Sequence, residues 1–457
     1  KEIKKMLFSL TNPEVAIMMM GIFLFAVLLG FPIAFTLMAM GLGFGYYAYF
    51  DPTKMEHLFD NRIFQLFVQN TYTVMDNNVL TAVPLFLFMG YLVERAGIVA
   101  KLFFAIRLAS HKLPASMAVA ALITCALFST ATGIIGAVVT LMGLLAWPAM
   151  IKAGYDKKFA SGIICSGGCL GILIPPSIML IVYSVIAQLS PLRLFAAAIF
   201  PGLMLAGLYI GYAIFRAWMN PSIAPKPAAE EIPPTAVIMK EVLVSFLPLF
   251  SLIILVLGTI LAGIATPAEA AAVGAFGSLV LSYFYKTLKW KNFKESVFLT
   301  AKTTAMIMWL FIGSWTFASV FSYLGGHEVF EHFFKSLNLQ PWQFLVITQL
   351  IIFLLGWPLE WTEILIIFVP IFLPLVEFFG VNPYFFAMLI ALNLQTSFLT
   401  PPMAMSAYYL KGVQSKNVEL MQIFGGIMPF LGIVILAMVL MYLFPGIALW
   451  LPETLFA

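Results

Sequence analysis

The chain has 457 residues, of which 62% are apolar and 10% are charged, and its formal net charge is +4. Soluble globular chains have roughly 45–50% apolar and about 25% charged residues, so this composition excludes a protein whose main solvent is water. The basic residues are spread over the loops between apolar segments, which excludes the continuous basic surface of a nucleic-acid-binding protein.

Apolar segments recur along the chain from Val15 to Phe444. At roughly 20 residues per crossing, they predict about eleven or twelve crossings or half-crossings of a bilayer. We therefore expect an all-α polytopic membrane protein. The basic start at residues 1–5 is followed by an apolar run without a small-residue cleavage site, so we do not expect a removable signal peptide there.

The first unusual segment lies between Lys112 and Lys152. No charged residue occurs between these two lysines, and the midpoint is the run Ser129–Gly133, which is rich in hydroxyl groups. Two apolar arms of roughly one span or less each, with basic ends and a polar tip, predict a hairpin. Because basic loops tend to stay cytoplasmic, we expect this hairpin to enter the membrane from the cytoplasm.

The next segment, residues 166–177, cannot form a continuous helix. It contains Gly167, Gly168 and Gly171, followed by the pair Pro175-Pro176. Adjacent prolines remove two backbone donors and clash with the preceding turn, and glycines lower the cost of unwinding. We predict a broken helix, whose free carbonyl groups suit a small cation and whose exposed helix N-terminus attracts an anion.

The second half of the chain repeats this order after a polar, proline-rich stretch from Ala217 to Lys240, which predicts a hinge. Residues 356–362 predict the tip of another hairpin, because the segment from Ile364 to Val376 is too short to cross comfortably. Another helix that we expect to be broken follows at Asn393–Pro402. Kinking or close packing would explain one such site, but two sites that each follow a hairpin favour a binding role.

The two halves are related by an internal repeat at an offset of 226 residues. Pro148, Gly154, Phe159, Ile164, Leu173, Pro175 and Pro176 recur without a gap as Pro374, Gly380, Phe385, Ile390, Leu399, Pro401 and Pro402. Such duplication is typical of secondary transporters.

Loop charges predict that the two repeats are inverted. Lys152, Lys157 and Lys158 follow the first half's Pro148, whereas the matching loop, residues 378–383, has no lysine or arginine. The positive-inside rule therefore places these loops on opposite sides of the membrane. The lysines within residues 1–5 disagree with this scheme, so we expect the first segment to lie at the membrane interface.

The other chemically active residue types indicate structure rather than catalysis. Cys125, Cys165 and Cys169 lie in apolar segments, and we interpret them as small core residues rather than as disulfide or metal ligands. The four histidines are scattered over polar connections, so we expect no enzymatic activity. A membrane-embedded enzyme and a channel are alternatives; a bound transition metal would favour the enzyme, and uphill uptake driven by a gradient would exclude the channel.

Three longer motifs carry a specific resemblance. Residues 170–177 read Leu-Gly-Ile-Leu-Ile-Pro-Pro-Ser, residues 265–275 read Ala-Thr-Pro-Ala-Glu-Ala-Ala-Ala-Val-Gly-Ala, and residues 84–95 read Pro-Leu-Phe-Leu-Phe-Met-Gly-Tyr-Leu-Val-Glu-Arg. With these motifs the chain resembles, over nearly its whole length, the large M subunit of TRAP (tripartite ATP-independent periplasmic) transporters. We expect Glu269 at a helix start, where the helix dipole favours a carboxylate, and Arg95 at a cytoplasmic helix end.

The resemblance implies a fold and a mechanism. The fold is that of an elevator-type transporter, similar to the ion transporter superfamily, in which a mobile domain with both hairpins carries substrate past a scaffold. The expected segments are scaffold helices at 1–80, a first transport repeat at 81–190, scaffold helices and linker at 191–300, a second transport repeat at 301–415 and a C-terminal scaffold helix at 416–457.

The resemblance also implies coupling to Na+ without an organic cofactor. The expected partners are a small membrane Q subunit and a periplasmic substrate-binding P subunit, and the expected location is the bacterial inner membrane. A stand-alone sodium/dicarboxylate elevator symporter without a binding protein is the alternative.

By analogy with the family, two groups of residues are expected to hold sodium ions. The first group is Ser129, Thr132, Gly133, Gly167 and Gly171, and the second is Gly356, Thr362, Asn393, Thr396 and Thr400. The candidates for substrate binding are Ser177, Gln395, Ser397 and Glu360. For Glu360, capping of its own hairpin tip is the alternative role.

Two places in the sequence depart from the family pattern. Residues 132–135 read Thr-Gly-Ile-Ile where many relatives have Ser-Gly-Ser-Ser, and Glu360 stands where an aspartate is usual. These departures resemble the branch of the family that handles monocarboxylates and sulfonates. We therefore expect the substrate to be a small organic acid anion, either a carboxylate or a sulfonate.

Overall fold

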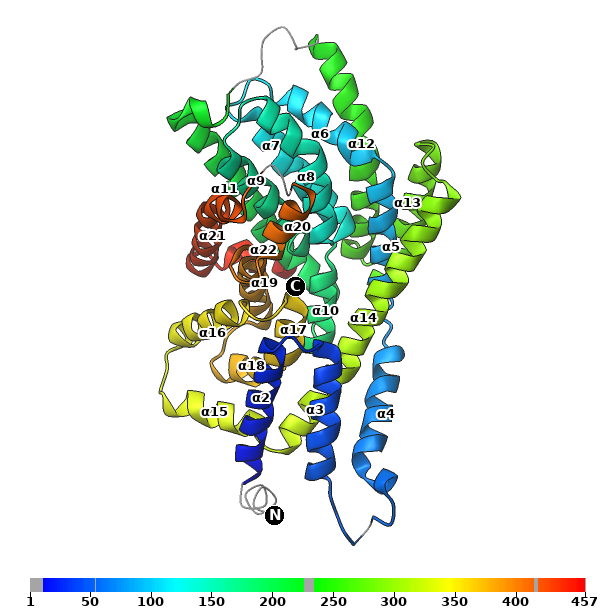
Figure 1. Cartoon of the computed structure of the whole chain (residues 1–457), viewed down its shortest axis with the longest axis vertical. Helices are drawn as coiled ribbons and strands as arrows, with labels where there is room; N and C mark the ends of the chain where they lie inside the picture. The colour runs from blue at the N-terminus through cyan, green and yellow to red at the C-terminus, as the bar shows by residue number, and fades with distance from the viewer. Residues whose placement is uncertain (1–10, 54, 226–233, 415–417, 457) are drawn as a thin grey trace. The chain divides into compact units, whose positions relative to one another are not determined.

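The computed structural model describes residues 11–53, 55–225, 234–414 and 418–456, and every regular element in these ranges is a helix (Figure 1). The all-α prediction is thereby confirmed for the described residues. The lysines within residues 1–5 and residues 226–233 of the predicted hinge lie outside them. In the described part of the hinge, α11 (Pro191–Met219) continues to Met219 and α12 (Thr235–Leu261) begins at Thr235.

Within the described residues, seven helices are long and apolar enough to cross a membrane, or eight if the bent pair Ala82–Arg95 and Ile98–Ala109 is one span. Six further apolar helices have 10–17 residues. At 1.5 Å per residue they reach about 15–26 Å, less than the roughly 30 Å of the hydrocarbon core, and the predicted eleven or twelve segments included such half-crossings.

The chain folds into two compact units. Unit 1 comprises Lys1–Asn78, Lys302–Ile351 and Pro358–Pro383, and unit 2 comprises Val79–Ala301, Ile352–Trp357 and Tyr384–Ala457. The division into five scaffold and transport segments stays a prediction.

In unit 1, α3 (Ile33–Ala48) packs closely against the second part of α14 (Trp290–Tyr323). Gly41 and Gly313 mark this contact, because a Cβ at Gly41 would lie 3.1 Å from the backbone nitrogen of Phe317 and one at Gly313 would lie 2.8 Å from the carbonyl oxygen of Ala34. Small residues at such positions let apolar helices approach closely. The helices that lie wholly or partly in unit 1 are α2 (Asn12–Leu28), α3 (Ile33–Ala48), η1 (Leu58–Asp60), α4 (Arg62–Met75), α14 (Trp290–Tyr323), α15 (Gly326–Ser336), α16 (Pro341–Leu355), α17 (Trp361–Glu363), the π-helical η5 (Ile364–Phe368) and α18 (Val369–Phe378).

Unit 2 holds the first hairpin and both helix breaks. Its closest helix crossing is between α9 and α21, where a Cβ at Gly162 or Gly426 would overlap the backbone of the facing helix. The helices of unit 2, besides α11, α12 and the start of α14, are α5 (Ala82–Arg95), α6 (Ile98–Ala109), α7 (Ser116–Thr132), α8 (Ile135–Lys152), α9 (Lys157–Cys169), η2 (Leu170–Ile172), α10 (Ile178–Ala187), η3 (Pro221–Ile223), α13 (Pro267–Phe284), α19 (Pro383–Leu399), α20 (Met405–Val413), α21 (Leu420–Leu443) and α22 (Gly446–Leu455).

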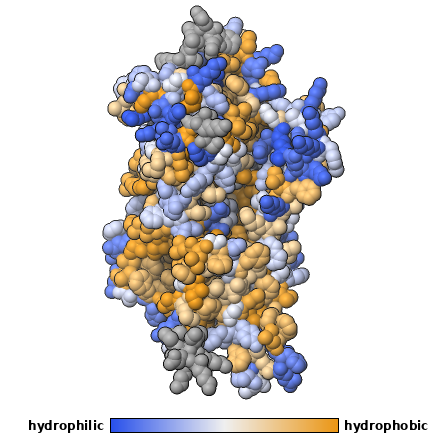
Figure 2. All heavy atoms as spheres, viewed as in Figure 1, coloured by the Kyte–Doolittle hydropathy of each residue, from blue (hydrophilic) through white to orange (hydrophobic). Residues whose placement is uncertain are grey.

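Apolar residues cover much of the face shown in Figure 2. Large apolar side chains such as Leu28, Trp218 and Met421 are exposed. Contiguous exposed apolar surface of this kind marks a contact with membrane or protein rather than with water.

Candidate functional site

The first predicted hairpin is present in unit 2. Helix α7 ends at Gly133, whose backbone N–H donates to the Ser129 carbonyl at 2.7 Å, and α8 begins at Ile135. Gly133 has a φ of +62°, a conformation that L side chains rarely adopt. The tip therefore favours glycine, and Ser129 and Thr132 lie in the last helical turn before it.

Two glycines from other elements press against this last turn. A Cβ at Gly171 would lie 2.8 Å from the carbonyl oxygen of Ser129, and a Cβ at Gly90 would lie 2.8 Å from the Cα of Thr132. Real Cβ contacts essentially never fall below 3.0 Å, so only glycine lets α5 and η2 approach the backbone of α7 this closely. Ser129, Thr132, Gly133 and Gly171, predicted as one group, are thereby brought together.

The remaining member of the first predicted group lies one turn away. Gly167 packs against α7 at Cys125, because a Cβ at Gly167 would lie 3.0 Å from the Cys125 sulfur. It therefore lies along the same α7–α9 contact as Gly171, nearer the start of the hairpin arm.

Helix α9 is interrupted where the sequence predicts. The turn η2 follows it, and α10 begins after the Pro175-Pro176 pair. Pro176 has no N–H to donate to the Ile172 carbonyl four residues earlier. The buried Ser177 hydroxyl donates to that carbonyl instead, at 2.6 Å.

The start of α10 reaches the hairpin tip. A Cβ at Gly133 would lie 3.3 Å from Cδ1 of Ile178 and 3.8 Å from its backbone nitrogen. The first N–H groups of a helix lack helical partners and carry the positive end of the helix dipole. A positive helix end and a turn rich in hydroxyl groups thus lie side by side.

The second break is shorter than predicted. Helix α19 continues through Asn393 to Leu399, and the interruption falls at residues 400–404, before α20. The helix persists because residues 393–399 contain no glycine and the proline pair removes donors only at its own positions. The carbonyl of Phe398, four residues before Pro402, accepts the hydroxyl of Ser406 at 2.6 Å.

The polar residues of this second segment are buried. The Thr396 hydroxyl donates to the Asn393 carbonyl at 2.7 Å, and the Thr400 hydroxyl donates to the Thr396 carbonyl at 2.8 Å. A hydroxyl group that donates its proton keeps two lone pairs, so these oxygens can still ligate a cation. The Ser129 hydroxyl donates to the Ala126 carbonyl at 3.3 Å, so its oxygen can also still ligate a cation.

Gln395 is the most unusual polar side chain of the segment. It is 0% exposed, and neither its amide nitrogen nor its amide oxygen has a hydrogen-bond partner among the described residues. Leaving such a group unpaired costs about 1–3 kcal/mol, so it needs a physical reason such as a ligand.

The other predicted residues of the second half divide between the units. Gly356 lies in unit 2 against Ser397, because a Cβ there would lie 2.9 Å from the Ser397 Cβ. Thr362 and Glu360 belong to unit 1, so the second predicted group is not gathered within one unit. Glu360 occupies the N-cap position of α17, but its carboxylate makes no capping hydrogen bond.

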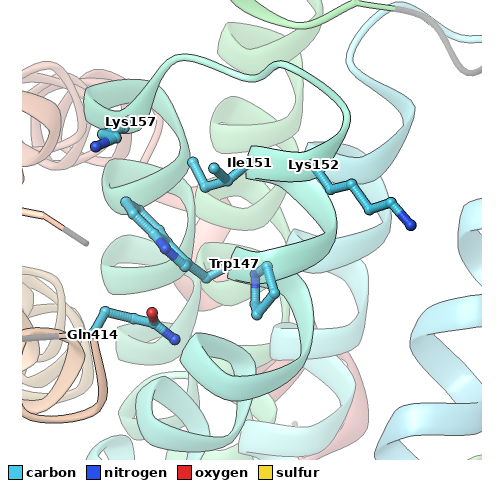
Figure 3. A pocket seen from close by; sticks show the side chains of 6 residues that line it. Trp147, Ile151, Lys152, Lys157 and Gln414 are labelled. Atoms are coloured by element: carbon cyan, nitrogen blue, oxygen red, sulfur yellow. The ribbon is translucent and has the colours of Figure 1, made fainter. Parts of the chain in front are cut away.

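The first hairpin is anchored to the second half through α20. Gly136 and Gly143 of α8 face Tyr409, Leu410 and Val413 of α20. Gln414 donates from Nε2 to the Gly143 carbonyl at 2.8 Å. Figure 3 shows Gln414 at a small pocket of about 330 Å³ beside Trp147, with Lys152 and Lys157 extending in opposite directions. The helix after the second break thus holds an arm of the first hairpin.

The helix ends that follow Pro148 and Pro374 have the same hydrogen bonds. The N–H of Gly154 donates to the Ile151 carbonyl and that of Tyr155 donates to Met150, each at 3.0 Å. At the offset of 226, the N–H of Gly380 donates to Glu377 at 3.0 Å and that of Val381 donates to Val376 at 2.9 Å. Gly154 and Gly380 both have positive φ.

Three positions outside the site are confirmed, namely the helix start at Glu269, the helix end at Arg95 and the burial of the three cysteines, whereas the cytoplasmic side of the Arg95 end stays a prediction. Glu269 lies in the first turn of α13, where its carboxylate accepts the N–H of Thr266 at 2.8 Å in a capping box. Helix α5 ends at Arg95, which also forms an ion pair with Glu295 at 3.2 Å. The three cysteines are free and buried.

The profile of the family described as "Tripartite ATP-independent periplasmic transporter, DctM component" matches residues 20–447 of the sequence. The chain belongs to this family. With its apolar helices, membership identifies a multi-pass membrane protein of a transport system.

Individual relatives agree with this TRAP assignment. The chain is 28% identical to the C4-dicarboxylate TRAP transporter large permease protein DctM of Pseudomonas aeruginosa, covering 84% of this chain and 88% of the relative. It is 30% identical to the sialic acid TRAP transporter large permease protein SiaM of Vibrio cholerae, covering 83% and 87%. The crystal structure of the Alcanivorax borkumensis YdaH transporter has a similar fold, with a TM-score of 0.60 at 16% identity over 93% of this chain and 99% of that one.

Sequence reasoning missed two contributors to the site in this TRAP family chain. Gly90 lies within a quoted motif, but only the fold shows that it contacts Thr132. Ser406 replaces the donor that Pro402 lacks, and a search for hydroxyl groups within a few residues after each proline pair would have found it.

Proposed function

We propose that this chain is the membrane permease of a sodium-driven transporter for a small organic acid anion, a carboxylate or a sulfonate, in the bacterial inner membrane. The observation that carries the proposal is the contact of the last turn of α7 with the interrupted segment α9–η2–α10, through Gly171 and Ser129 and through Gly133 and Ile178. The organic acids in the names of the two relatives support the class of substrate.

The proposal assigns a first sodium ion to the oxygen atoms around Ser129, Thr132, Gly133, Gly167 and Gly171. These residues fit a small hard cation because hydroxyl and carbonyl oxygens are the ligands that such cations prefer. The second ion is assigned to Gly356, Asn393, Thr396 and Thr400, which all belong to unit 2.

The substrate anion is assigned to Ser177, Gln395 and Ser397, which all belong to unit 2. The unpaired amide of Gln395 supports this assignment, because it offers both a donor and an acceptor in a buried place. The start of α10 adds the positive end of a helix dipole, which favours a carboxylate or a sulfonate.

We infer that the chain moves its substrate by an elevator mechanism built on two inverted repeats. The recurrence of the same helix-end hydrogen bonds at Gly154 and Gly380 supports the repeat. The loop charges support its inversion. Single cysteines near Lys157 and near Val381 should label from opposite sides of the membrane, and labelling of both from the same side would contradict the inversion.

Two partners complete the proposal: a small membrane Q subunit and a periplasmic substrate-binding protein. The test is uptake of a radiolabelled organic acid by vesicles that contain the purified permease and its Q subunit. Uptake should require both an inward sodium gradient and the cognate binding protein. Equal uptake on a proton gradient without sodium would contradict the coupling, and full uptake without the binding protein would favour the stand-alone symporter.

A further inference from the structure

A groove in unit 2 is lined by none of the residues assigned to ions or substrate. It lies between α11 and the corner where α21 meets α22, and its volume is about 900 Å³. Its wall consists of large apolar side chains, including Phe200, Leu203, Met204, Phe444, Ile447 and Trp450. Leu203, Phe444 and Trp450 are each more than half exposed.

The groove exists because of Pro445. Helix α21 ends at Leu443, Pro445 takes the N-cap position of α22, and α22 turns to pack along α11. The rings of Phe200 and Trp450 lie 5.6 Å apart, and Arg193 donates from Nη2 to the Phe456 carbonyl at 2.9 Å. Along the direction in which the residue numbers of α11 fall from 200 to 193, those of the contacting segment rise from 450 to 456. Helix α22 therefore runs antiparallel to α11, and the groove lies at the corner.

The position of the groove in the bilayer follows from the charges on α11. Arg193 and Arg216 are the charged residues of this helix, and 216 − 193 = 23 residues separate them. At 1.5 Å per residue this is about 35 Å, close to the roughly 30 Å of the hydrocarbon core. Each arginine therefore marks one interface. The groove residues 200–204 lie about 10–16 Å below Arg193, within the leaflet next to it.

Beyond the groove, the same face of α11 is open and carries glycines. Gly207 and Gly211 follow Leu203 at steps of four residues, and a Cβ at either would meet nothing within 4 Å. Residues four apart share a helix face. A flexible hydrocarbon chain can therefore continue from the groove along this face toward the middle of the bilayer.

Two charged side chains of opposite sign, Arg193 and Glu453, lie at the end of the groove nearest the membrane interface. The Arg193 guanidinium donates from Nη2 to the Phe456 carbonyl, and the group carries five N–H donors in a geometry that fits phosphate. Glu453 is exposed and follows Trp450 by three residues, so it lies on the same face of α22 as the groove wall. A phosphate group complements the charge of Arg193, and an ammonium group complements the charge of Glu453.

We propose that this groove binds one zwitterionic phospholipid with an ammonium headgroup, of the phosphatidylethanolamine type. One acyl chain lies against Phe200, Leu203 and Trp450, the phosphate lies at Arg193 and the ammonium lies at Glu453. The proposal does not depend on the transported substrate or on sodium coupling.

The test measures phospholipid that stays bound to the full chain, purified with its membrane partner, after washing with detergent. Native mass spectrometry with added phosphatidylethanolamine and phosphatidylglycerol gives the amount and identity of bound lipid. Leu203→Trp fills the groove and Arg193→Gln removes the phosphate ligand. The matched controls are Phe215→Trp and Arg216→Gln, at exposed positions near the other end of α11.

We expect about one phosphatidylethanolamine per chain in the wild type. Retention should be at least about tenfold lower in Leu203→Trp, which fills the groove, and in Arg193→Gln, which removes a charge-assisted hydrogen bond, and it should be unchanged in both controls. Arg193→Lys should retain part of the binding. Glu453→Gln should shift the preference toward phosphatidylglycerol. Inorganic phosphate should not displace the lipid.

Retention in Leu203→Trp, or equal retention of the two lipids by the wild type, would overturn the proposal. A photo-crosslinker at Met204 of the otherwise unchanged chain gives a measurement that does not depend on how the variants fold. It should capture a phospholipid in native membranes. Capture of a second copy of this chain or of a partner subunit would assign the groove to a protein contact instead.

Discussion

Replacement of Gly171 by alanine tests the assignment of the first sodium ion most sharply. A Cβ at this position would lie 2.4 Å from the Cβ of Ser129 and 2.8 Å from its carbonyl oxygen, and ordinary contact begins at 3.4 Å, so the two segments must separate by about 3.4 − 2.4 = 1.0 Å. Overpacking of this kind costs about 1–3 kcal/mol. If the cost falls on the ion-bound state, sodium affinity decreases about 5- to 150-fold.

The assay is the melting temperature of the purified protein as a function of sodium concentration, because a bound ion stabilises the folded state according to its dissociation constant. Gly171→Ala should shift the sodium dependence to higher concentration, while Gly412→Ala, where a Cβ meets nothing within 4 Å, should not. Ser129→Ala, which adds no atoms, should weaken sodium binding without the clash. A wild-type sodium dependence in both Gly171→Ala and Ser129→Ala would refute the assignment.

Three further predictions follow from individual contacts. Gly426→Ala should reduce accumulation of folded protein, measured by fluorescence-detected chromatography, because its Cβ would overlap the backbone of α9; Gly432→Ala, with open space around it, should accumulate normally. Gln395→Leu should abolish uptake. It should also raise the melting temperature measured without substrate, because it removes an unpaired buried amide that costs about 1–3 kcal/mol. A lower melting temperature would show that the amide has a partner in the folded protein. The hydrogen bond and the charge of Lys335 lower the pKa of Glu331 on α15 from its usual 4.5. The ionised carboxylate therefore stabilises the folded state above pH 4.5, and this stabilisation is lost as the pH falls through the lowered pKa. The melting temperatures of the wild type and of Glu331→Gln should converge as the pH falls through that lowered pKa.

The positions where the backbone changes direction could be predicted from the sequence because they depend on local chemistry. The tip at Gly133 and the break before Ser177 occur at residues whose backbone preferences are strong. The repeat likewise identified Gly154 and Gly380, which end their helices with the same hydrogen bonds. The extent of the second break was predicted less well. The positions of the prolines show which backbone donors are missing, but they do not show how far the helix continues before the proline pair.

The contacts that gather the site could not be predicted, because they join distant parts of the chain. The approach of Gly90 to Thr132 depends on how α5 crosses α7, and the bond from Gln414 to Gly143 spans the two halves of the sequence. The unpaired state of Gln395 is also a property of packing: an amide in this sequence is equally compatible with a satisfied core group.

The most direct test of the central claim is simultaneous measurement of radioactive sodium and labelled organic acid entering the same reconstituted vesicles. We predict that both enter together in a fixed ratio, that removal of the binding protein stops both, and that Ser129→Ala or Thr396→Ala lowers uptake at limiting sodium. Accumulation of the organic acid against its gradient with no accompanying entry of sodium would contradict it.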